Sequence, residues 1–158
     1  MIKSIIFDFD GVILDTVDLK GDSFVELFSD YDQKTKDQIY NFHNQNLGKD
    51  RIYKIEYILK NILKTNISDS ILNVLKNKFS KIVFNKVVMA PFINGSLEFL
   101  INNKDQFSYF ISTATPTIEI IKILKIRKIY KLFSSVYGSP ENKELHIESI
   151  LRKKNILN

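Results

Sequence analysis

Two aspartates lie two residues apart near the start of the chain, directly after an apolar run. Asp8 and Asp10 follow residues 5–7, and Gly11 comes next. An aspartate is a poor choice for closing a hydrophobic strand unless its carboxylate binds something, and hard divalent cations prefer oxygen ligands. The pattern therefore predicts a cation site; the alternative is a turn that an aspartate and a glycine merely cap. An EF-hand calcium loop is excluded because its further acids and closing Glu are missing.

The strand that would carry this acidic pair is predicted over residues 2–9. Its β-branched and aromatic residues place apolar side chains on both faces, which is typical of a central strand in a covered parallel sheet. Ligand-binding residues of open α/β sheets lie at the carboxyl ends of the strands. Asp8 and Asp10 stand at such an end.

Residues 16 to about 86 have a weak strand signal and a strong helical period. This period predicts four helices, near 17–29, 34–46, 50–64 and 69–86. After Pro91 the pattern becomes one of alternating helices and strands. We expect strands at 108–112 and 133–137, and helices at about 95–102, 116–126 and 141–154. Thr115 is expected to cap the second of these helices, with Pro116 at its first position.

The order of these elements predicts an α/β fold. One strand comes first, a helical insert interrupts, and a β/α array resumes, which indicates a Rossmann-like, three-layer core with a parallel sheet. We assign residues 1–15 and 89–158 to this core and residues 16–88 to an inserted α-helical cap.

Composition narrows the classes of function. The 158 residues are 44% hydrophobic and 26% charged, as in ordinary globular proteins, and the absence of cysteine excludes disulfides, thiolate zinc sites and cysteine nucleophiles. Two histidines, His43 and His146, are a poor basis for a histidine metal site or a serine–histidine triad, and we expect them to be structural or surface residues. No apolar run is long enough to span a membrane and the N-terminus does not resemble a secretory signal, so we expect a cytoplasmic protein.

The net charge of +5 comes largely from a basic segment at residues 122–131 and from residues 152–154. In the first segment, lysines alternate with isoleucines and leucines, which favours the solvated face of an amphipathic helix over a nucleic-acid site. Nucleic-acid binding is therefore ranked last among the three classes of function that we consider. A positive field also favours a phosphorylated substrate.

The segment DFDGV at residues 8–12 closely resembles the first motif of the haloacid dehalogenase superfamily of phosphohydrolases. Ser112, which ends an apolar strand, stands where the second motif has Ser or Thr, and Lys143 stands where the third has Lys. The insert resembles the helical cap of the phosphoglycolate phosphatase and β-phosphoglucomutase branch. Within it, residues 48–54 are similar to a basic cap segment of a subgroup linked to sugar phosphates.

The resemblance implies a Mg²⁺-dependent phosphatase of small phosphorylated metabolites, such as sugar phosphates. Asp8 would be the nucleophile that forms an aspartyl-phosphate, and Asp10 would be the general acid and base. Asp8 and the Asp10 carbonyl would hold Mg²⁺. The implied phosphate-binding groups are Ser112, Lys143 and the backbone N–H groups near Gly11 and Thr113.

Arg51 and Lys54 lie three residues apart, hence on one face of a predicted helix of the cap. The resemblance implies that they contact the leaving group of the substrate. The alternative is an ordinary exposed helix face.

The fourth motif of the superfamily, one or two aspartates after a further strand, is absent from the 158 residues. The resemblance places further strands beside the first one, so residues 2–9 would form a bare sheet edge, which natural proteins avoid. Three explanations stay open: a truncated chain, pairing of this edge in a homo-oligomer, or a degenerate member that binds phosphate with little turnover. We expect weak Mg²⁺ binding and low activity. A phosphosugar mutase and a non-catalytic phosphate-binding or assembly module are the alternatives to a phosphatase.

Overall fold

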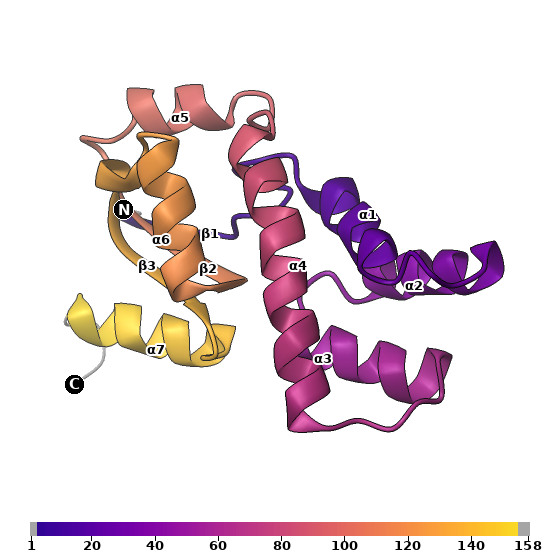
Figure 1. Ribbon diagram of the computed structural model, residues 1–158. Helices are drawn as coiled ribbons and strands as arrows, with labels where there is room; N and C mark the ends of the chain where they lie inside the picture. Colours follow the sequence, from indigo (N-terminus) through magenta and orange to yellow (C-terminus); the bar gives the residue numbers. More distant parts are fainter. Residues whose placement is uncertain (1–2, 155–158) are drawn as a thin grey trace. The chain divides into compact units, whose positions relative to one another are not determined.

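The computed structural model describes residues 3–154 (Figure 1). The chain divides into two compact units. The sheet unit contains the residues up to Asp15 and those from Ala90 onward, and the helical unit is Thr16–Met89.

The sheet unit is built on a parallel sheet. The structure describes three strands in the order β1-β2-β3, namely Ser4–Phe7, Ser108–Pro116 and Phe133–Ser139. The register pairs Phe7 with Ile111, so Asp8 follows β1 at the level of Ser112, which itself pairs with Tyr137 in β3. The predicted α/β class and parallel sheet are confirmed.

Helices cover both faces of this sheet (Figure 1). Because successive side chains of a strand point to opposite faces, Tyr109 and Phe110 of β2 meet different neighbours. The Tyr109 ring lies 6.3 Å from the Phe99 ring, and the Lys154 ammonium lies 5.5 Å from the Phe110 ring. Phe99 belongs to α5 and Lys154 directly follows α7. The helices of this unit are α5 (Ser96–Asn102), α6 (Thr117–Ile126), the short η2 (Tyr130–Leu132) and α7 (Lys143–Lys153).

The prediction that Thr115 caps a helix beginning at Pro116 is wrong. The helix α6 begins at Thr117, and no side chain caps its N-terminus. The physical reason is strand pairing: Pro116 still pairs with Ser139, so the chain stays extended through Thr115 and the strand is longer than its apolar run.

The first strand lies at an edge of the described sheet. Within residues 3–154, β1 pairs with β2 alone, and the side chain of Ile6 is 38% exposed. This matches the bare edge expected from the sequence. Pairing of the edge with a second copy of the chain stays a prediction.

The helical unit contains the four helices that the period predicts. They are α1 (Val17–Leu27), α2 (Gln33–Gln45), α3 (Arg51–Tyr57), which continues into the π-helical η1 (Ile58–Ile62), and α4 (Asp69–Met89). Asp32 and Asp50 accept backbone N–H bonds at the starts of α2 and α3, as N-cap residues do. Aromatic rings fill the interior: Phe24 lies 4.2 Å from Phe79 between ring centroids.

None of the helices within residues 3–154 combines the length and the apolar character that a membrane span requires.

The lysines of the basic segment lie on the solvent-exposed face of α6 and in the turn after it. Lys122, Lys125 and Lys128 are exposed, whereas Ile123 and Leu124 of the same segment are buried. The amphipathic-helix interpretation is therefore confirmed.

The two ends of the helical unit join the sheet unit side by side. The Asp15 N–H donates to the Pro91 carbonyl at 2.9 Å, and Leu14 forms a β-bridge with Phe92. The entry to the insert and the exit from it are thus fastened together within the sheet unit.

Gly138 allows β3 to approach the junction of β2 and α6. Its N–H donates to Thr117 Oγ1 at 3.1 Å, and its carbonyl accepts from the same hydroxyl at 3.0 Å. A Cβ at this position would collide with the Thr115 carbonyl oxygen and lie 2.8 Å from the Thr117 backbone nitrogen. Only glycine fits so close to the backbone of another element.

We predict that Gly138→Ala lowers the free energy of unfolding by about 1–3 kcal/mol, because backbone atoms must move to admit the methyl group. Urea denaturation followed by circular dichroism measures this. Gly48→Ala is the control, since no atom lies within 4 Å of its added Cβ, and it should change stability by less than about 0.5 kcal/mol. Equal stability of the two variants would contradict the steric argument.

Candidate active site

A tight turn after β1 carries both aspartates. The Phe9 carbonyl accepts from the Ile13 N–H at 2.9 Å, and the Gly11 N–H donates to the Leu14 carbonyl at 2.8 Å. Gly11 has a φ of +72°, a conformation that favours glycine. Phe9 is fully buried, which anchors the turn and leaves the flanking carboxylates of Asp8 and Asp10 partly exposed.

The Asp8 carboxylate forms an ion pair with Lys143. The Lys143 Nζ donates to Asp8 Oδ2 at 2.7 Å, and Asp8 Oδ1 accepts from the Phe9 N–H at 2.7 Å. The structure therefore brings together the predicted nucleophile and the predicted phosphate-binding cation, which lie far apart in the sequence. Lys143 reaches Asp8 from the first residue of α7, where Asn142 Oδ1 caps the helix by accepting from the Leu145 N–H.

The Asp10 carboxylate is held by the neighbouring strand. Thr115 Oγ1 donates to Asp10 Oδ2 at 3.2 Å, and the Thr115 N–H donates to Thr113 Oγ1 at 3.2 Å. Both threonines are buried. Sequence reasoning missed the contact between Thr115 and Asp10; the available signal was a hydroxyl at the carboxyl end of the adjacent parallel strand.

The Ser112 side chain is buried and faces α7. Its Oγ lies 2.9 Å from Nδ1 of His146, a residue with 0% exposure. The structural role expected of His146 thus has a specific partner that sequence reasoning did not name. Thr113 lies on the opposite face of β2 from Ser112, as strand alternation requires. Phosphate binding by Ser112, Thr113 and Gly11 stays a prediction.

Burial lowers the pKa of His146 below its ordinary value of 6.5. The backbone of Gly138 and the carboxylates of Glu141 and Glu144 act in the opposite direction, whereas Lys143 adds to the lowering. The folded protein therefore favours the neutral imidazole.

Arg51 and Lys54 are both buried within the helical unit, so the exposed-face alternative is wrong. The Arg51 guanidinium donates to Ser80 Oγ and lies 5.3 Å from the Phe79 ring. The Lys54 Nζ lies 3.2 Å from His43 Nδ1. Both cations thus have partners inside the helical unit, as buried charges require.

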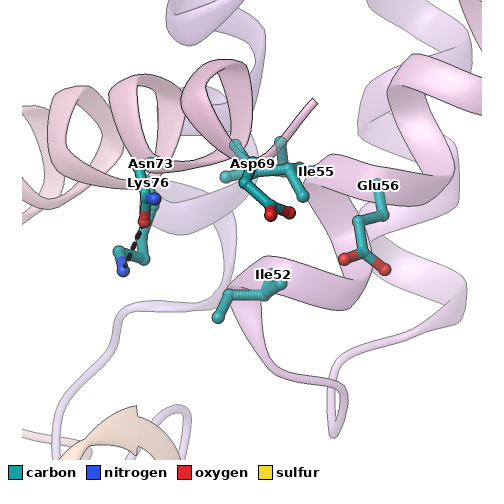
Figure 2. Close-up of a pocket in the computed structure, with 7 residues that line it drawn as sticks. Ile52, Ile55, Glu56, Asp69, Asn73 and Lys76 are labelled. Atoms are coloured by element: carbon teal, nitrogen blue, oxygen red, sulfur yellow. Dashed lines mark hydrogen bonds between the residues drawn. The ribbon is translucent and has the colours of Figure 1, made fainter. Parts of the chain in front are cut away.

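A pocket of about 320 Å³ lies between α3 and the start of α4 (Figure 2). Its lining combines the apolar Ile52 and Ile55 with Glu56, Asp69 and the hydrogen-bonded pair of Asn73 and Lys76. None of the predicted site residues lines it.

The comparison with family models decides the classification. Residues 5–158 match the model of the haloacid dehalogenase-like hydrolases. The chain belongs to this family. The predicted resemblance of the chain to the haloacid dehalogenase superfamily is therefore confirmed.

Solved structures share the fold of this dehalogenase-like hydrolase. A predicted phosphoglycolate phosphatase from Haemophilus somnus has a TM-score of 0.75 at 17% identity, over 98% of this chain and 72% of its own. CbbY from Rhodobacter sphaeroides, in complex with xylulose-(1,5)-bisphosphate, has a TM-score of 0.74 at 14% identity, over 98% and 73%. YfnB from Bacillus subtilis, bound to magnesium, has a TM-score of 0.64 at 20% identity, over 87% and 65%. A search of curated protein sequences gives no match.

The donor groups of the hydrolase at this turn suit a hard cation. Asp8 and Asp10 supply oxygen, and Mg²⁺ is commonly held by one or two carboxylates together with water and a substrate phosphate. Within residues 3–154 there is no cluster of three or more Asp, Glu, His or Cys side chains that could hold a metal ion. The two carboxylates alone would supply only part of the coordination of such a cation.

We predict that the hydrolase loses stability as His146 becomes protonated. Its contribution to the free energy of unfolding is present in full above pH 6.5 and is lost as the pH falls from there through the lowered pKa. Urea midpoints measured between about pH 8 and about pH 5 should fall more steeply for the wild type than for His146→Asn, which does not titrate. The carboxylates are common to both proteins, so parallel pH profiles would refute this role of His146.

Proposed function

We propose that this hydrolase is a phosphatase of small phosphorylated metabolites, with sugar phosphates as the substrate class. The observation that carries the proposal is the contact of 2.7 Å between Asp8 and Lys143 at the carboxyl ends of the strands. The contact joins a carboxylate of the turn that also carries Asp10 to a cation of α7.

Asp8 is suited to attack phosphorus. A carboxylate attacks without the help of a base, so one Asp8 oxygen forms a bond to phosphorus while the ester P–O bond breaks and an aspartyl-phosphate results. The Lys143 ammonium would interact with the phosphoryl oxygens and stabilise the charge that develops on them.

Asp10 is proposed to move the protons. Its carboxylic acid form donates a proton to the leaving oxygen, and its carboxylate then takes a proton from the water that hydrolyses the aspartyl-phosphate. The hydrogen bond from Thr115 fixes the Asp10 side chain for both steps.

Asp8 and the Asp10 carbonyl would hold Mg²⁺. When bound, the ion neutralises charge between the nucleophile and the phosphate, which would otherwise repel each other. The magnesium-bound structure of the similar protein YfnB supports magnesium as the cation. Because the described residues contain no third acid near the pair, we expect the affinity for Mg²⁺ to be weak.

The buried cations of the helical unit are proposed to recognise the rest of the substrate. Arg51 and Lys54 project from one face of α3, and each is a donor to phosphate or hydroxyl groups. The complex of CbbY with a sugar bisphosphate supports a sugar phosphate as the ligand class. A phosphosugar mutase shares these requirements; trapping of a bisphosphate intermediate would distinguish it.

A phosphate-binding module without turnover is the second candidate. The observation that favours it is the absence of a third metal-ligating acid within residues 3–154. Such a module would be stabilised against heat by inorganic phosphate but would release none from any substrate.

We predict that Asp8→Asn abolishes Mg²⁺-dependent release of phosphate from a panel of sugar phosphates, because the amide is not a nucleophile. Asp10→Asn should lower kcat by about 10²–10⁴-fold through the loss of acid–base catalysis. A malachite green assay, with and without a chelator, measures both. Normal turnover by Asp8→Asn would refute the nucleophile, and thermal stabilisation by phosphate without any turnover in the wild type would favour the module instead.

We also predict that Lys54→Met raises KM for the best substrate of the panel more than it lowers kcat, because the variant removes a charge from substrate binding and leaves the reacting groups intact. Lys60→Met, at an exposed position in η1, is the matched control and should leave KM unchanged. An equal KM for wild type and Lys54→Met would exclude Lys54 from substrate binding.

A further inference from the structure

We propose that His146 is a positioning residue: its hydrogen bond to Ser112 fixes the first turns of α7 on β2 and thereby holds the Lys143 ammonium beside Asp8. The position of Lys143 is a property of the folded chain. Its effect on catalysis rests on the function proposed above.

The two contacts lie on one face of the same helix. Lys143 and His146 are three residues apart in α7, so their side chains are neighbours on its surface. One reaches the carboxylate that follows β1, at 2.7 Å, and the other reaches the hydroxyl of Ser112 in β2, at 2.9 Å. The beginning of α7 is thus joined by polar contacts to two adjacent strands.

The two contacts differ in burial, and this difference indicates which one positions the other. The side chains of Lys143 and Asp8 are 41% and 37% exposed, and ion pairs with such exposure contribute little to stability because two flexible side chains must be ordered. His146 is fully buried and its ring stacks on Tyr137 at 5.6 Å between centroids. The buried contact is therefore the anchor, and the exposed ion pair depends on it.

The hydrogen bond between His146 and Ser112 is directional, whereas apolar packing is not. Packing against a side chain such as Ile150, which is buried one turn further along α7, is non-directional and permits small rotations of the helix. A bond from a rigid imidazole to one hydroxyl fixes the rotation of α7 about its axis, because hydrogen bonds weaken steeply with misalignment. This rotation sets where the Lys143 side chain points.

Peptide-resolved acetylation of the intact chain by acetic anhydride, followed by mass spectrometry, tests the proposal without requiring turnover. Lys143 should react slowly relative to the exposed Lys122, because an ion-paired ammonium is a poor nucleophile. Asp8→Asn should raise the Lys143 rate several-fold, and His146→Leu should raise it to a similar extent. His146→Asn should restore the slow rate, since its amide places a polar atom near the position of Nδ1.

Ile150→Ala is the matched control for loss of packing, and its Lys143 rate should stay that of the wild type. Should His146→Leu fail to fold, Ser112→Ala removes the same bond from the strand and should accelerate Lys143 equally. An unchanged Lys143 rate in Ser112→Ala or in a folded His146→Leu, or an equal increase in Ile150→Ala, would overturn the proposal. So would a wild-type Lys143 as reactive as Lys122.

Catalysis provides a separate readout. If the wild type releases phosphate, kcat/KM should fall in His146→Leu and recover in His146→Asn. A wild type without turnover would count against the proposed phosphatase, whereas the acetylation result would still decide whether His146 positions Lys143.

Discussion

The ion pair between Lys143 and Asp8 is the interaction on which the site depends. Two carboxylates on one short turn repel each other, and a fixed cation beside one of them offsets that repulsion. The parallel sheet supplies the place, because the carboxyl ends of its strands meet at one edge. The cation comes from the helix that follows the third strand, and all the elements from α1 to β3 lie between the two partners in the sequence.

The carboxylate of Asp10 is held at the same edge of the sheet. Thr115 reaches Asp10 because β2 continues beyond its apolar run, and Gly138 lets β3 approach this extended segment closely. The positions of the Thr115 hydroxyl, the Asp10 carboxylate and Gly138 thus depend on one another. A change in the packing of β3 would therefore be felt at the Asp10 carboxylate.

The sequence predicted the α/β class, the parallel sheet and most helices and strands, since apolar runs and helical periods reveal such elements directly. It placed Asp8 and Lys143 in one site only through resemblance to a family, because no periodicity reports a contact between residues 8 and 143. Contacts that depend on register were missed for the same reason: Thr115 with Asp10, and Ser112 with His146. The burial of Arg51 and Lys54 could not be predicted from the local sequence. A helix face with two cations has the pattern of a solvent-exposed face, and only the positions of the neighbouring helices show that it is covered.

The bond between Asp15 and Pro91, with the bridge from Leu14 to Phe92, means that the chain leaves the sheet unit and returns to it at nearly one point. A segment inserted at such a junction adds little strain to its host, whatever its length, because its ends are already adjacent. Evolution can therefore exchange one insert for another while the sheet unit is inherited unaltered.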